Sequence, residues 1–287
     1  MDKKAFIKYV ASMLLFGLNG IVASHIPLSS YEIVLMRTLI GGALLAVLFL
    51  LGKGKFQIKA HKKDTLFIVL SGVAMGTSWM LLYEAYQQIG VSLSSLLYYC
   101  GPVIVMVLSP LIFRERLTAP KIIGFAAVLV GIVLVNGNIA ATDGSVWGFV
   151  CGMLSAVMYF FMVTLNKQSK HITGLENSVI QLVAGFLTVF AFVSIKQGFV
   201  LDVPPVAWGW ILMLGLVNTG VGCYLYFSSL SKLPVQTVAV CSYLELLSAV
   251  VFAALLLGEQ MTAVQIVGAA CIIGGAMIGE LVKMKKR

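Results

Sequence analysis

Glu245 is the side chain whose type and position carry the most chemical information in this sequence. It lies nine residues into the apolar stretch Gln236–Leu257. A carboxylate there could bind a substrate, carry a proton, or do both. The alternative is structural: a neutral acid, or one bonded to hydroxyls of another helix, that holds the molecule together. A charge at the centre of a membrane helix costs about 2.5–3.5 kcal/mol, so we expect Glu245 to face the protein interior or water.

Arg37 is a second charged side chain inside an apolar stretch, Ile33–Leu51. Since helices extend a few residues beyond such stretches, it lies about six residues into the helix, or roughly 9 Å from its outer end at about 1.5 Å per residue. One interpretation is an interfacial anchor, or an ion-pair partner of Glu32 or Glu84. The other is a binding group for a substrate carboxylate, and both stay open at this point.

Pro102 follows Gly101 within a third apolar stretch, Ser92–Phe113. We predict a helix break at Pro102, because proline removes a backbone hydrogen bond and can free a carbonyl oxygen toward a ligand. A kink without a binding role is the alternative.

The composition determines which elements must position these groups. Of the 287 residues, 60% are hydrophobic and 11% are charged, whereas soluble domains have about 25% charged residues. The mean hydropathy is +1.01. So few charged groups could not cover a surface exposed to water, and we therefore expect lipid to be the main solvent.

Ten stretches are long enough to cross a bilayer, which takes about 20 mainly apolar residues. Their runs are continuous rather than alternating, which favours helices over a barrel. The first is expected to be a span and not a removed signal peptide. The stretches are Ala5–Ser24, Ile33–Leu51, Thr65–Ala85, Ser92–Phe113, Pro120–Asn136, Ser145–Leu165, Glu176–Lys196, Val206–Phe227, Gln236–Leu257 and Ala263–Val282.

The positive charges predict the orientation. If the N-terminus is cytoplasmic, the cytoplasmic side receives 18 of the 20 lysine and arginine residues, all except Lys196 and the intramembrane Arg37. Such an excess of positive charge marks the inner side of membrane proteins. We therefore expect a plasma-membrane protein with both termini in the cytoplasm, and we read the net charge of +9 as an orientation signal, not a nucleic-acid footprint.

An internal repeat appears when the sequence is shifted by 144 residues. Leu70–Gly76 then aligns with Leu214–Gly220 without a gap. Each half would contain five spans, and because five is odd the second half must be inverted in the membrane. We predict two inverted five-helix repeats, residues 1–138 and 139–287, an arrangement typical of transporters and shared by some channels.

Several short motifs occur in an order that resembles the EamA type of the drug/metabolite transporter superfamily, over essentially the whole chain. The resemblance implies an all-α integral membrane protein with ten helices around a central cavity, and transport, often export, of small metabolites. One departure is Leu246, where such proteins often have proline, which implies a less bent helix. The motifs are Phe16-Gly-Leu-Asn19, Arg37, Gly101-Pro102, Glu115-Arg-Leu-Thr118, Thr219, Tyr224, Tyr243-Leu-Glu245 and Leu257-Gly-Glu-Gln-Met-Thr262.

The resemblance also implies which aromatic residues lie near the cavity. Tyrosine deep in a membrane needs a hydrogen-bond partner, although each such ring could instead be core. Asn19 and Asn218 could bind a substrate or only form hydrogen bonds between helices. The predicted substrate-binding residues are Glu245, Tyr243, Tyr98, Tyr99, Trp79, Tyr83, Tyr159, Asn19, Asn218 and Tyr224, with Pro102 as the helix break.

We therefore expect a secondary transporter of small metabolites, such as amino acids or amines, that exports or exchanges them by alternating access. Transport could also be coupled to protons through Glu245, because burial in a medium of low dielectric constant favours the neutral acid. The expected partners are a small-molecule substrate and the lipid bilayer, with no nucleic acid, in a monomer or weak homodimer. A lipid-carrier flippase and a channel-like facilitator are the alternatives.

An enzyme is the rival from another class. Membrane-embedded catalysis would need clustered acids or histidines, and the histidines, His25, His61 and His171, fall in separate loops. The cysteines show no metal-ligand spacing, and no nucleotide-binding motif follows a strand. We predict no catalytic site, no metal site and no cofactor.

Overall fold

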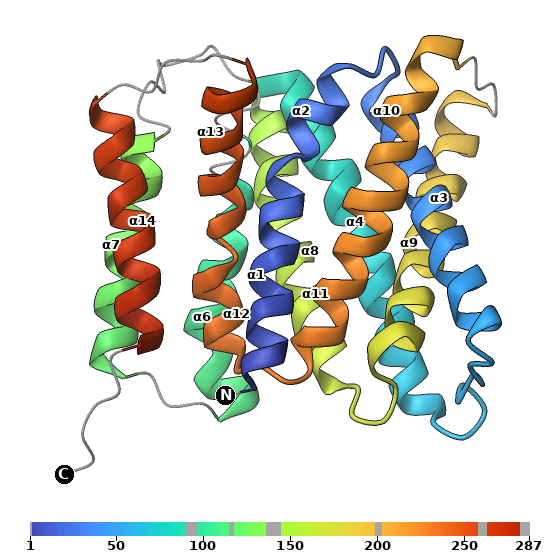
Figure 1. The fold of residues 1–287 in the computed structure, drawn as a ribbon, viewed down its shortest axis with the longest axis horizontal. Helices are drawn as coiled ribbons and strands as arrows, with labels where there is room; N and C mark the ends of the chain where they lie inside the picture. Colours follow the sequence, from blue (N-terminus) through green and yellow to red (C-terminus); the bar gives the residue numbers. More distant parts are fainter. Residues whose placement is uncertain are drawn as a thin grey trace.

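The computed structural model describes residues 2–89, 94, 97–114, 118–135, 145–198, 203–257 and 263–281. Within these ranges all regular secondary structure is helical, and the helices run side by side as one bundle (Figure 1). The predicted beginning of a span at Ser92, and the motif residues Glu115 and Glu259, lie outside the described residues.

The helices follow the predicted apolar stretches closely wherever these stretches are described. In chain order the elements are α1 (Lys3–Gly17), α2 (Asn19–Ser24), α3 (Ser30–Leu51), α4 (Lys62–Ile89), α6 (Cys100–Phe113), α7 (Ala119–Val135), α8 (Val146–Gln168), α9 (Gly174–Gln197), the 3-10 turn η1 (Pro205–Ala207), α10 (Trp208–Leu212), the π-helix η2 (Met213–Val221), α11 (Gly222–Leu230), α12 (Val235–Cys241), α13 (Leu244–Leu257) and α14 (Ala263–Leu281).

Six helical stretches in the described ranges are long and apolar enough to cross a membrane. They are Lys3–Ser24, Ser30–Leu51, Lys62–Ala85, Val146–Gln168, Gly174–Lys196 and Pro205–Leu230. Large apolar side chains also cover the outer surface, with Leu111 79% and Ile195 87% exposed, as lipid contact requires. The chain is thus a multi-pass membrane protein, while ten spans and the inverted repeat stay predictions.

Three of the predicted spans are interrupted near the middle of the bundle. α1 gives way to α2 at Leu18, a turn at Tyr99 precedes α6, and Ser242 and Tyr243 separate α12 from α13. The predicted break at Pro102 therefore lies three residues earlier, at Tyr99. Pro102 itself occupies the first turn of α6, where a missing N–H is tolerated.

The helix that contains Leu246 is interrupted in the structure, and whether it is less bent than is usual in such proteins stays a prediction. That predicted span, Gln236–Leu257, is divided into α12 and α13 although no proline or glycine stands at the division. The hydroxyl of Tyr243 donates a hydrogen bond to the Tyr99 carbonyl oxygen at 2.9 Å, and so joins this interruption to the one before α6. The interruption is therefore accompanied by a tertiary contact, and no proline or glycine in the sequence predicts it.

The π-helix η2 is the second feature without a sequence signal. Its register is seen in the Thr219 hydroxyl, which donates to the carbonyl oxygen of Leu214, five residues back, at 2.8 Å. Such wide turns often occur at functional sites. η2 packs against α3, which carries Arg37.

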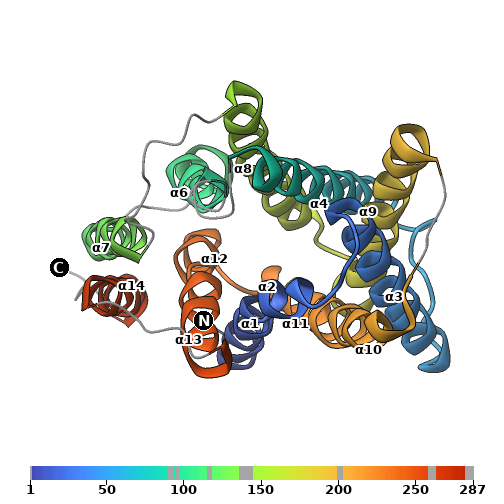
Figure 2. The ribbon, with the colours of Figure 1, turned by 90° about the horizontal axis from the view of Figure 1, so that it is seen from above.

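Glycines let several helices approach closely. A Cβ added at Gly76 of α4 would lie 2.8 Å from the carbonyl oxygen of Gly185 in α9. α7 and α14 lie side by side at one edge of the bundle, where a Cβ at Gly131 would lie 2.6 Å from the Gly268 carbonyl oxygen (Figures 1 and 2). These seams use small residues, as membrane helix pairs commonly do.

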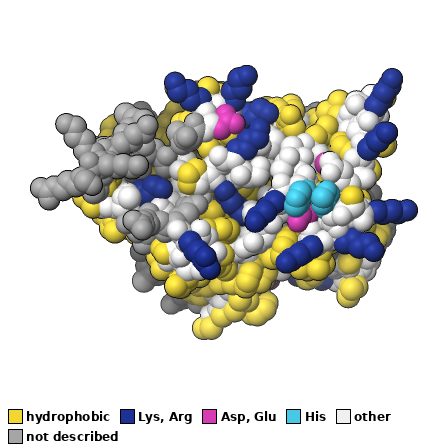
Figure 3. All heavy atoms as spheres, turned by 90° about the horizontal axis from the view of Figure 1, so that it is seen from below, with side chains coloured by type: hydrophobic (Ala, Val, Ile, Leu, Met, Phe, Trp, Pro, Cys, Tyr) yellow, Lys and Arg dark blue, Asp and Glu magenta, His cyan; other side chains and the backbone are white. Residues whose placement is uncertain are grey.

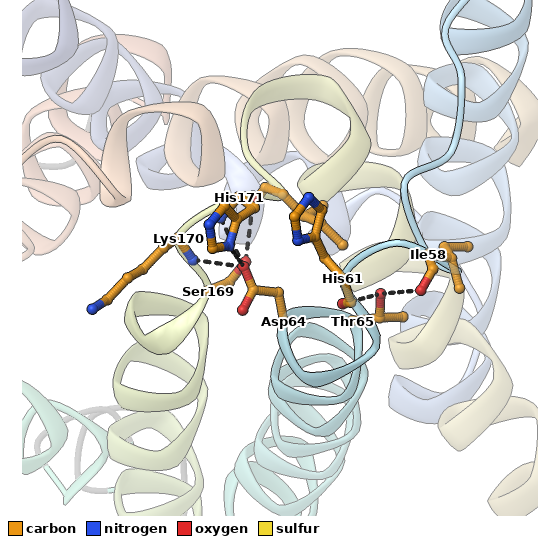
Figure 4. A network of polar contacts seen from close by, with 8 residues as sticks. Ile58, His61, Asp64, Thr65, Ser169, Lys170 and His171 are labelled. Atoms are coloured by element: carbon orange, nitrogen blue, oxygen red, sulfur yellow. Dashed lines mark hydrogen bonds and ion pairs between the residues drawn. The ribbon is translucent and has the colours of Figure 1, made fainter.

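The end of the bundle at which α1 and α4 begin is called the N-terminal end, and the opposite end the far end. Lysine and arginine side chains are spread over the N-terminal end (Figure 3). Asp64 joins α4 to the α8–α9 loop there: its Oδ2 accepts from the backbone N–H groups of Lys170 at 3.0 Å and His171 at 2.7 Å (Figure 4). The His61 and His171 rings stack beside it at 4.3 Å.

Candidate functional site

A cavity of about 560 Å³ lies in the middle of the bundle, and we call it the central cavity. Its size falls in the usual range for small-molecule sites, about 300–1,000 Å³. Residues of α1, α2, α3, α4, α6, α8, α11 and α13 form its wall. The predicted site residues that the structure brings to this wall are Asn19, Trp79, Tyr83, Tyr98, Tyr99, Pro102, Tyr159 and Glu245.

Glu245 reaches the central cavity from the first turn of α13. The interruption at Ser242 and Tyr243 creates this position, because without it Glu245 would lie in the middle of a helix. A carboxylate in the first turn is stabilised by the helix dipole and by nearby N–H groups without partners. Among the described residues its side chain has no hydrogen-bond or ion-pair partner.

Arg37 lines the same cavity and is only 4% exposed. Its Nε donates to the Thr219 hydroxyl at 2.9 Å, and its guanidinium lies over the Trp79 ring at 4.5 Å from the centroid. The π-register of η2 orients that hydroxyl. These contacts use one of the five guanidinium donors, and the terminal nitrogens have no hydrogen-bond partner in the described part of the chain.

The interpretation of Arg37 as an interfacial anchor, or as a partner of Glu32 or Glu84, was wrong. Glu32 caps the start of α3 through Ser29. Glu84 accepts from the Tyr31 hydroxyl and lies 3.5 Å from the Lys196 ammonium at the far end. Counting residues along the helix gave the depth of Arg37, but the direction of its side chain depends on the helices beside it.

Tyrosine hydroxyls add polar groups to the apolar wall. The Tyr98 and Tyr159 rings meet edge to face at 5.5 Å. Tyr159 and Tyr226 lie near each other, and both line the cavity. Neither buried hydroxyl makes a hydrogen bond of normal geometry with a described residue. Because a buried hydroxyl without a partner is costly, these groups favour water or a polar ligand in the cavity.

Three predicted binding residues lie outside the cavity wall. Tyr243 is fully buried, and its hydroxyl bonds to the Tyr99 backbone. Asn218 is also fully buried; its Nδ2 donates to the Leu15 carbonyl oxygen and to Asn19 Oδ1 at 3.2 and 3.1 Å. Lys8 Nζ lies 5.1 Å from the Tyr224 ring centroid. In each case a helix-to-helix contact occupies the side chain.

Other wall residues were not predicted but follow a simple spacing rule. Side chains three, four and seven residues apart share a helix face. Starting from Glu245, this spacing finds Ser242 in the turn before α13 and Ala249 on α13, and starting from Trp79 it finds Met75 and Leu82 on α4. The same rule around Asn19 gives Phe16 and Ala23. Gly20, next to Asn19 in the chain, also lines the wall, and α11 adds Cys223, Tyr226 and Phe227.

The chemistry of the central cavity is therefore amphoteric and largely apolar. The Arg37 guanidinium and the Glu245 carboxylate line the same wall, yet no ion pair within 4.0 Å joins them in the described structure. Methionine, phenylalanine and tryptophan side chains form much of the remaining wall. The described residues contain no group of three His, Cys, Asp or Glu side chains that could hold a metal ion.

Comparison with solved structures supports this architecture. A crystal structure matches with a TM-score of 0.82 over 98% of this chain and 99% of the other, at 15% sequence identity, which shows a shared fold. Among curated relatives, the uncharacterized transporter YxxF of Bacillus subtilis is 26% identical over 279 residues, 94% of this chain and 88% of the relative. The uncharacterized transporter YetK of Bacillus subtilis is 26% identical over 295 residues, 97% and 87% of the two chains.

A third relative carries a more specific name. The probable terminal-alkyne amino-acid exporter of Streptantibioticus cattleyicolor is 26% identical over 224 residues, 77% of this chain and 74% of the exporter. Residues 3–137 and 144–279 both match the EamA-like transporter family. This match covers nearly all of the membrane-embedded helices described above, so the chain belongs to the EamA-like transporter family, a drug/metabolite-type group of membrane transporters.

Proposed function

We propose that this protein is a secondary transporter of small amphoteric metabolites, with amino acids that have apolar side chains as the leading class. The carrying observation is that Arg37 and Glu245 line one cavity without forming an ion pair. A ligand with both a carboxylate and an ammonium group could pair with each of them. The amino-acid exporter among the relatives supports the same class.

The balance of charge favours a zwitterion over an amine or an acid alone. An amine bound to Glu245 would leave the guanidinium of Arg37 unpaired and repelling it. An acid bound to Arg37 would face the carboxylate of Glu245. Since a buried charge without a partner is strongly unfavourable, the doubly charged ligand satisfies the site best. Apolar wall residues such as Met75 and Phe227 could accommodate its side chain.

We further propose that residues 1–138 and 139–287 are inverted repeats that exchange conformations during transport. Contacts between positions 144 residues apart support this plan. Tyr243 bonds to its own counterpart, Tyr99. The glycine contact between Gly76 and Gly185 also has its counterpart: a Cβ at Gly41 would lie 3.1 Å from the Gly220 nitrogen.

The packing between the central cavity and the N-terminal end of the bundle indicates from which side of the membrane the cavity is closed. Between the central cavity and the N-terminal end, Tyr9 and Val238 are fully buried, and the Tyr9 hydroxyl donates to the Val238 carbonyl oxygen at 2.9 Å. Gln236 links Lys121 at 2.8 Å to Ser109 at 3.0 Å. With that end cytoplasmic, as the lysines favour, we propose a state sealed toward the cytoplasm.

Binding to the purified protein tests the substrate class directly. Leucine, leucinamide and 4-methylpentanoate share one side chain but carry both charges, only the cation, or only the anion. We expect leucine alone to raise the unfolding temperature, since a ligand at 100 times its dissociation constant stabilises by about 2.7 kcal/mol. Equal stabilisation by the three compounds would contradict amphoteric recognition.

Transport is tested in proteoliposomes by counterflow of labelled leucine. Saturable counterflow would distinguish an alternating-access carrier from a channel-like facilitator, which cannot exchange substrate against its gradient. Proton coupling is measured in the same vesicles with a pH dye. If the substrate ammonium competes with a proton for Glu245, leucine affinity falls as the pH is lowered. A pH-independent affinity would argue against proton exchange at Glu245.

A further inference from the structure

A second cavity lies outside the central one, on the outer surface between α4 and α9. Its volume is about 490 Å³. Residues of the α3–α4 loop border it at the N-terminal end of the bundle. We call it the α4–α9 groove, and the residues that define it are Phe56 and Ile58 of the loop, Val73 of α4, and Val183, Leu187 and Thr188 of α9.

The α4–α9 groove is apolar and open at the outer surface of the bundle. Val73, Val183 and Leu187 are 39%, 39% and 56% exposed. Thr188 is its one hydroxyl-bearing wall residue among those described, and that hydroxyl donates to the Ala184 carbonyl oxygen of its own helix at 2.8 Å. Since no polar side chain among the described residues of this wall needs a further hydrogen-bond partner, the groove is complementary to a hydrocarbon chain.

The length of the groove fits one lipid leaflet. On α9 its wall runs from Val179 to Thr188, which is about 13–14 Å at 1.5 Å per residue. The hydrocarbon core of a bilayer is about 30 Å thick, so one leaflet contributes about 15 Å. One acyl chain that enters from the N-terminal end would fill the groove to roughly the bilayer midplane.

The loop at the entrance combines this apolar wall with positive charge. In the segment 53–60, Lys53, Lys55 and Lys59 are exposed and alternate with Phe56 and Ile58, which face the groove. Lys55 and Phe56 are neighbours in residues 54–57, and Lys59 follows Ile58 in the turn of residues 58–60, so basic and apolar side chains occur together at the mouth of the groove. This pattern suits the boundary between lipid headgroups and acyl chains.

Nearby acids do not neutralise these lysines. Glu176 is 6% exposed, and its Oε1 accepts from the Gln57 backbone N–H at 2.6 Å, which fastens the loop to α9. Asp64 is engaged by the α8–α9 loop. Within the described ranges neither Lys55 nor Lys59 has an ion-pair partner. Figure 3 shows the many basic side chains of this end.

We propose that the α4–α9 groove binds one acyl chain of an anionic phospholipid whose phosphate lies against Lys55 and Lys59. The site does not depend on which substrate the central cavity transports. Its occupant would come from the leaflet at the N-terminal end.

The test is lipid titration of the delipidated protein in detergent, followed by native mass spectrometry. Dioleoylphosphatidylglycerol should bind more tightly than dioleoylphosphatidylcholine. The double substitution Lys55→Gln and Lys59→Gln should weaken phosphatidylglycerol binding about 25-fold, or about fivefold per lysine, and leave phosphatidylcholine binding unchanged. The matched control Lys3→Gln with Lys4→Gln removes two exposed charges at the same end and should stay within twofold. Equal losses in both double variants would overturn the proposal in favour of diffuse attraction.

A second arm tests the acyl chain. Val183→Trp fills the groove and should weaken both lipids at least fivefold, whereas Val150→Trp, at a position 40% exposed on α8, should not. Unfolding temperatures near that of the parent show that both variants are folded. Retained lipid binding in Val183→Trp, or displacement of the lipid by free glycerol phosphate, would overturn the proposal. So would a protein dimer that Val183→Trp dissociates, because the occupant would then be a second chain.

Discussion

The two helix interruptions that meet inside the bundle have the same backbone design and different side chains. A turn at Tyr99 precedes α6, and a turn at Ser242 and Tyr243 precedes α13. The Tyr243 hydroxyl donates to the Tyr99 carbonyl oxygen, 144 residues away, which is the shift that aligns the two halves of the sequence. After each interruption a new helix begins, and its first turn contributes to the wall of the central cavity.

The difference lies in the residues of those first turns. In α6, Gly101 packs so closely that an added Cβ would lie 2.8 Å from the Tyr159 ring. At the equivalent place in α13, Glu245 points a carboxylate at the cavity. One interruption therefore serves close packing and the other carries charge. The comparison teaches that two interruptions with similar backbones can serve one cavity differently, since only the second brings a charged side chain to it.

Proline substitutions in α13 should reduce the stability more than the other test substitutions. They test whether the backbone of α13 begins as that of α6 does. Leu246 and Pro102 both occupy the third position of their helices, so Leu246→Pro should cost at most about 1 kcal/mol beyond Leu246→Ala. The Leu247 N–H donates to the Tyr243 carbonyl oxygen at 3.2 Å. Leu247→Pro should therefore cost about 3 kcal/mol beyond Leu247→Ala.

Thermal unfolding in detergent measures these four variants, and each alanine variant controls for the lost side chain. Equal proline penalties at positions 246 and 247 would show that α13 does not begin as α6 does.

Glu245→Gln tests whether the charged interruption carries the function. The amide keeps the shape of the side chain but cannot pair with an ammonium group, so leucine counterflow should fall about 100-fold, or about 2.7 kcal/mol. The unfolding temperature should change little, because a buried charge is removed rather than created. Glu84→Gln, which alters a carboxylate at the far end, is the matched control and should transport within twofold of the parent. Parental counterflow in Glu245→Gln would make Glu245 structural.

The membrane class and the helix positions could be predicted because both depend on local composition. Apolar stretches of about 20 residues are visible without tertiary information. The interruptions were harder. Pro102 signalled one of them within three residues, but nothing in the sequence around Ser242 signals the other, which forms where Tyr243 finds a partner on another helix. Likewise, no residue type announces the π-helix η2.

For the candidate site, the sequence predicted which residue types take part better than it predicted where their side chains point. Glu245, Trp79 and Tyr159 were found because polar or amphipathic groups are conspicuous in apolar helices, and the structure places them on one cavity. Asn218 is equally conspicuous but bonds to a neighbouring helix. For Arg37 the sequence left an interfacial anchor and a binding group both open, because its environment is built by Thr219 of η2, which is distant in sequence.

Arg37→Gln makes the two halves alike at one more position, since Gln181 stands 144 residues later and is buried in a bond to the Ser71 hydroxyl at 2.8 Å. We expect leucine counterflow to fall about 30-fold, or about 2 kcal/mol, because a buried carboxylate of the substrate loses its partner. Arg37→Lys should restore only part of it, since an ammonium keeps the charge but lacks the planar fork that stacks on Trp79. Full activity in Arg37→Gln would show that Arg37 is not part of the substrate site. Binding of leucinamide to that variant would support the proposed site, because the repelling guanidinium is gone.

Tyr243→Phe should have the smallest effect, and it tests the contact that joins the two interruptions. It deletes one buried hydrogen bond, from the Tyr243 hydroxyl to the Tyr99 carbonyl oxygen, and leaves the ring in place. The expected loss of stability is about 1 kcal/mol. Leucine counterflow should stay within about threefold of the parent, because Tyr243 lies outside the wall of the central cavity.

Tyr224→Phe is the matched control for that substitution, since the Tyr224 ring lies near Lys8 and is remote from the interruptions in the chain. Its unfolding temperature and counterflow should equal those of the parent. A loss of counterflow in Tyr243→Phe as large as that in Glu245→Gln would assign the Tyr243 hydroxyl to substrate binding, as its residue type alone first suggested. In that case the contact between the two interruptions would have to open during transport, because a hydroxyl held by the Tyr99 carbonyl oxygen cannot donate to a ligand at the same time.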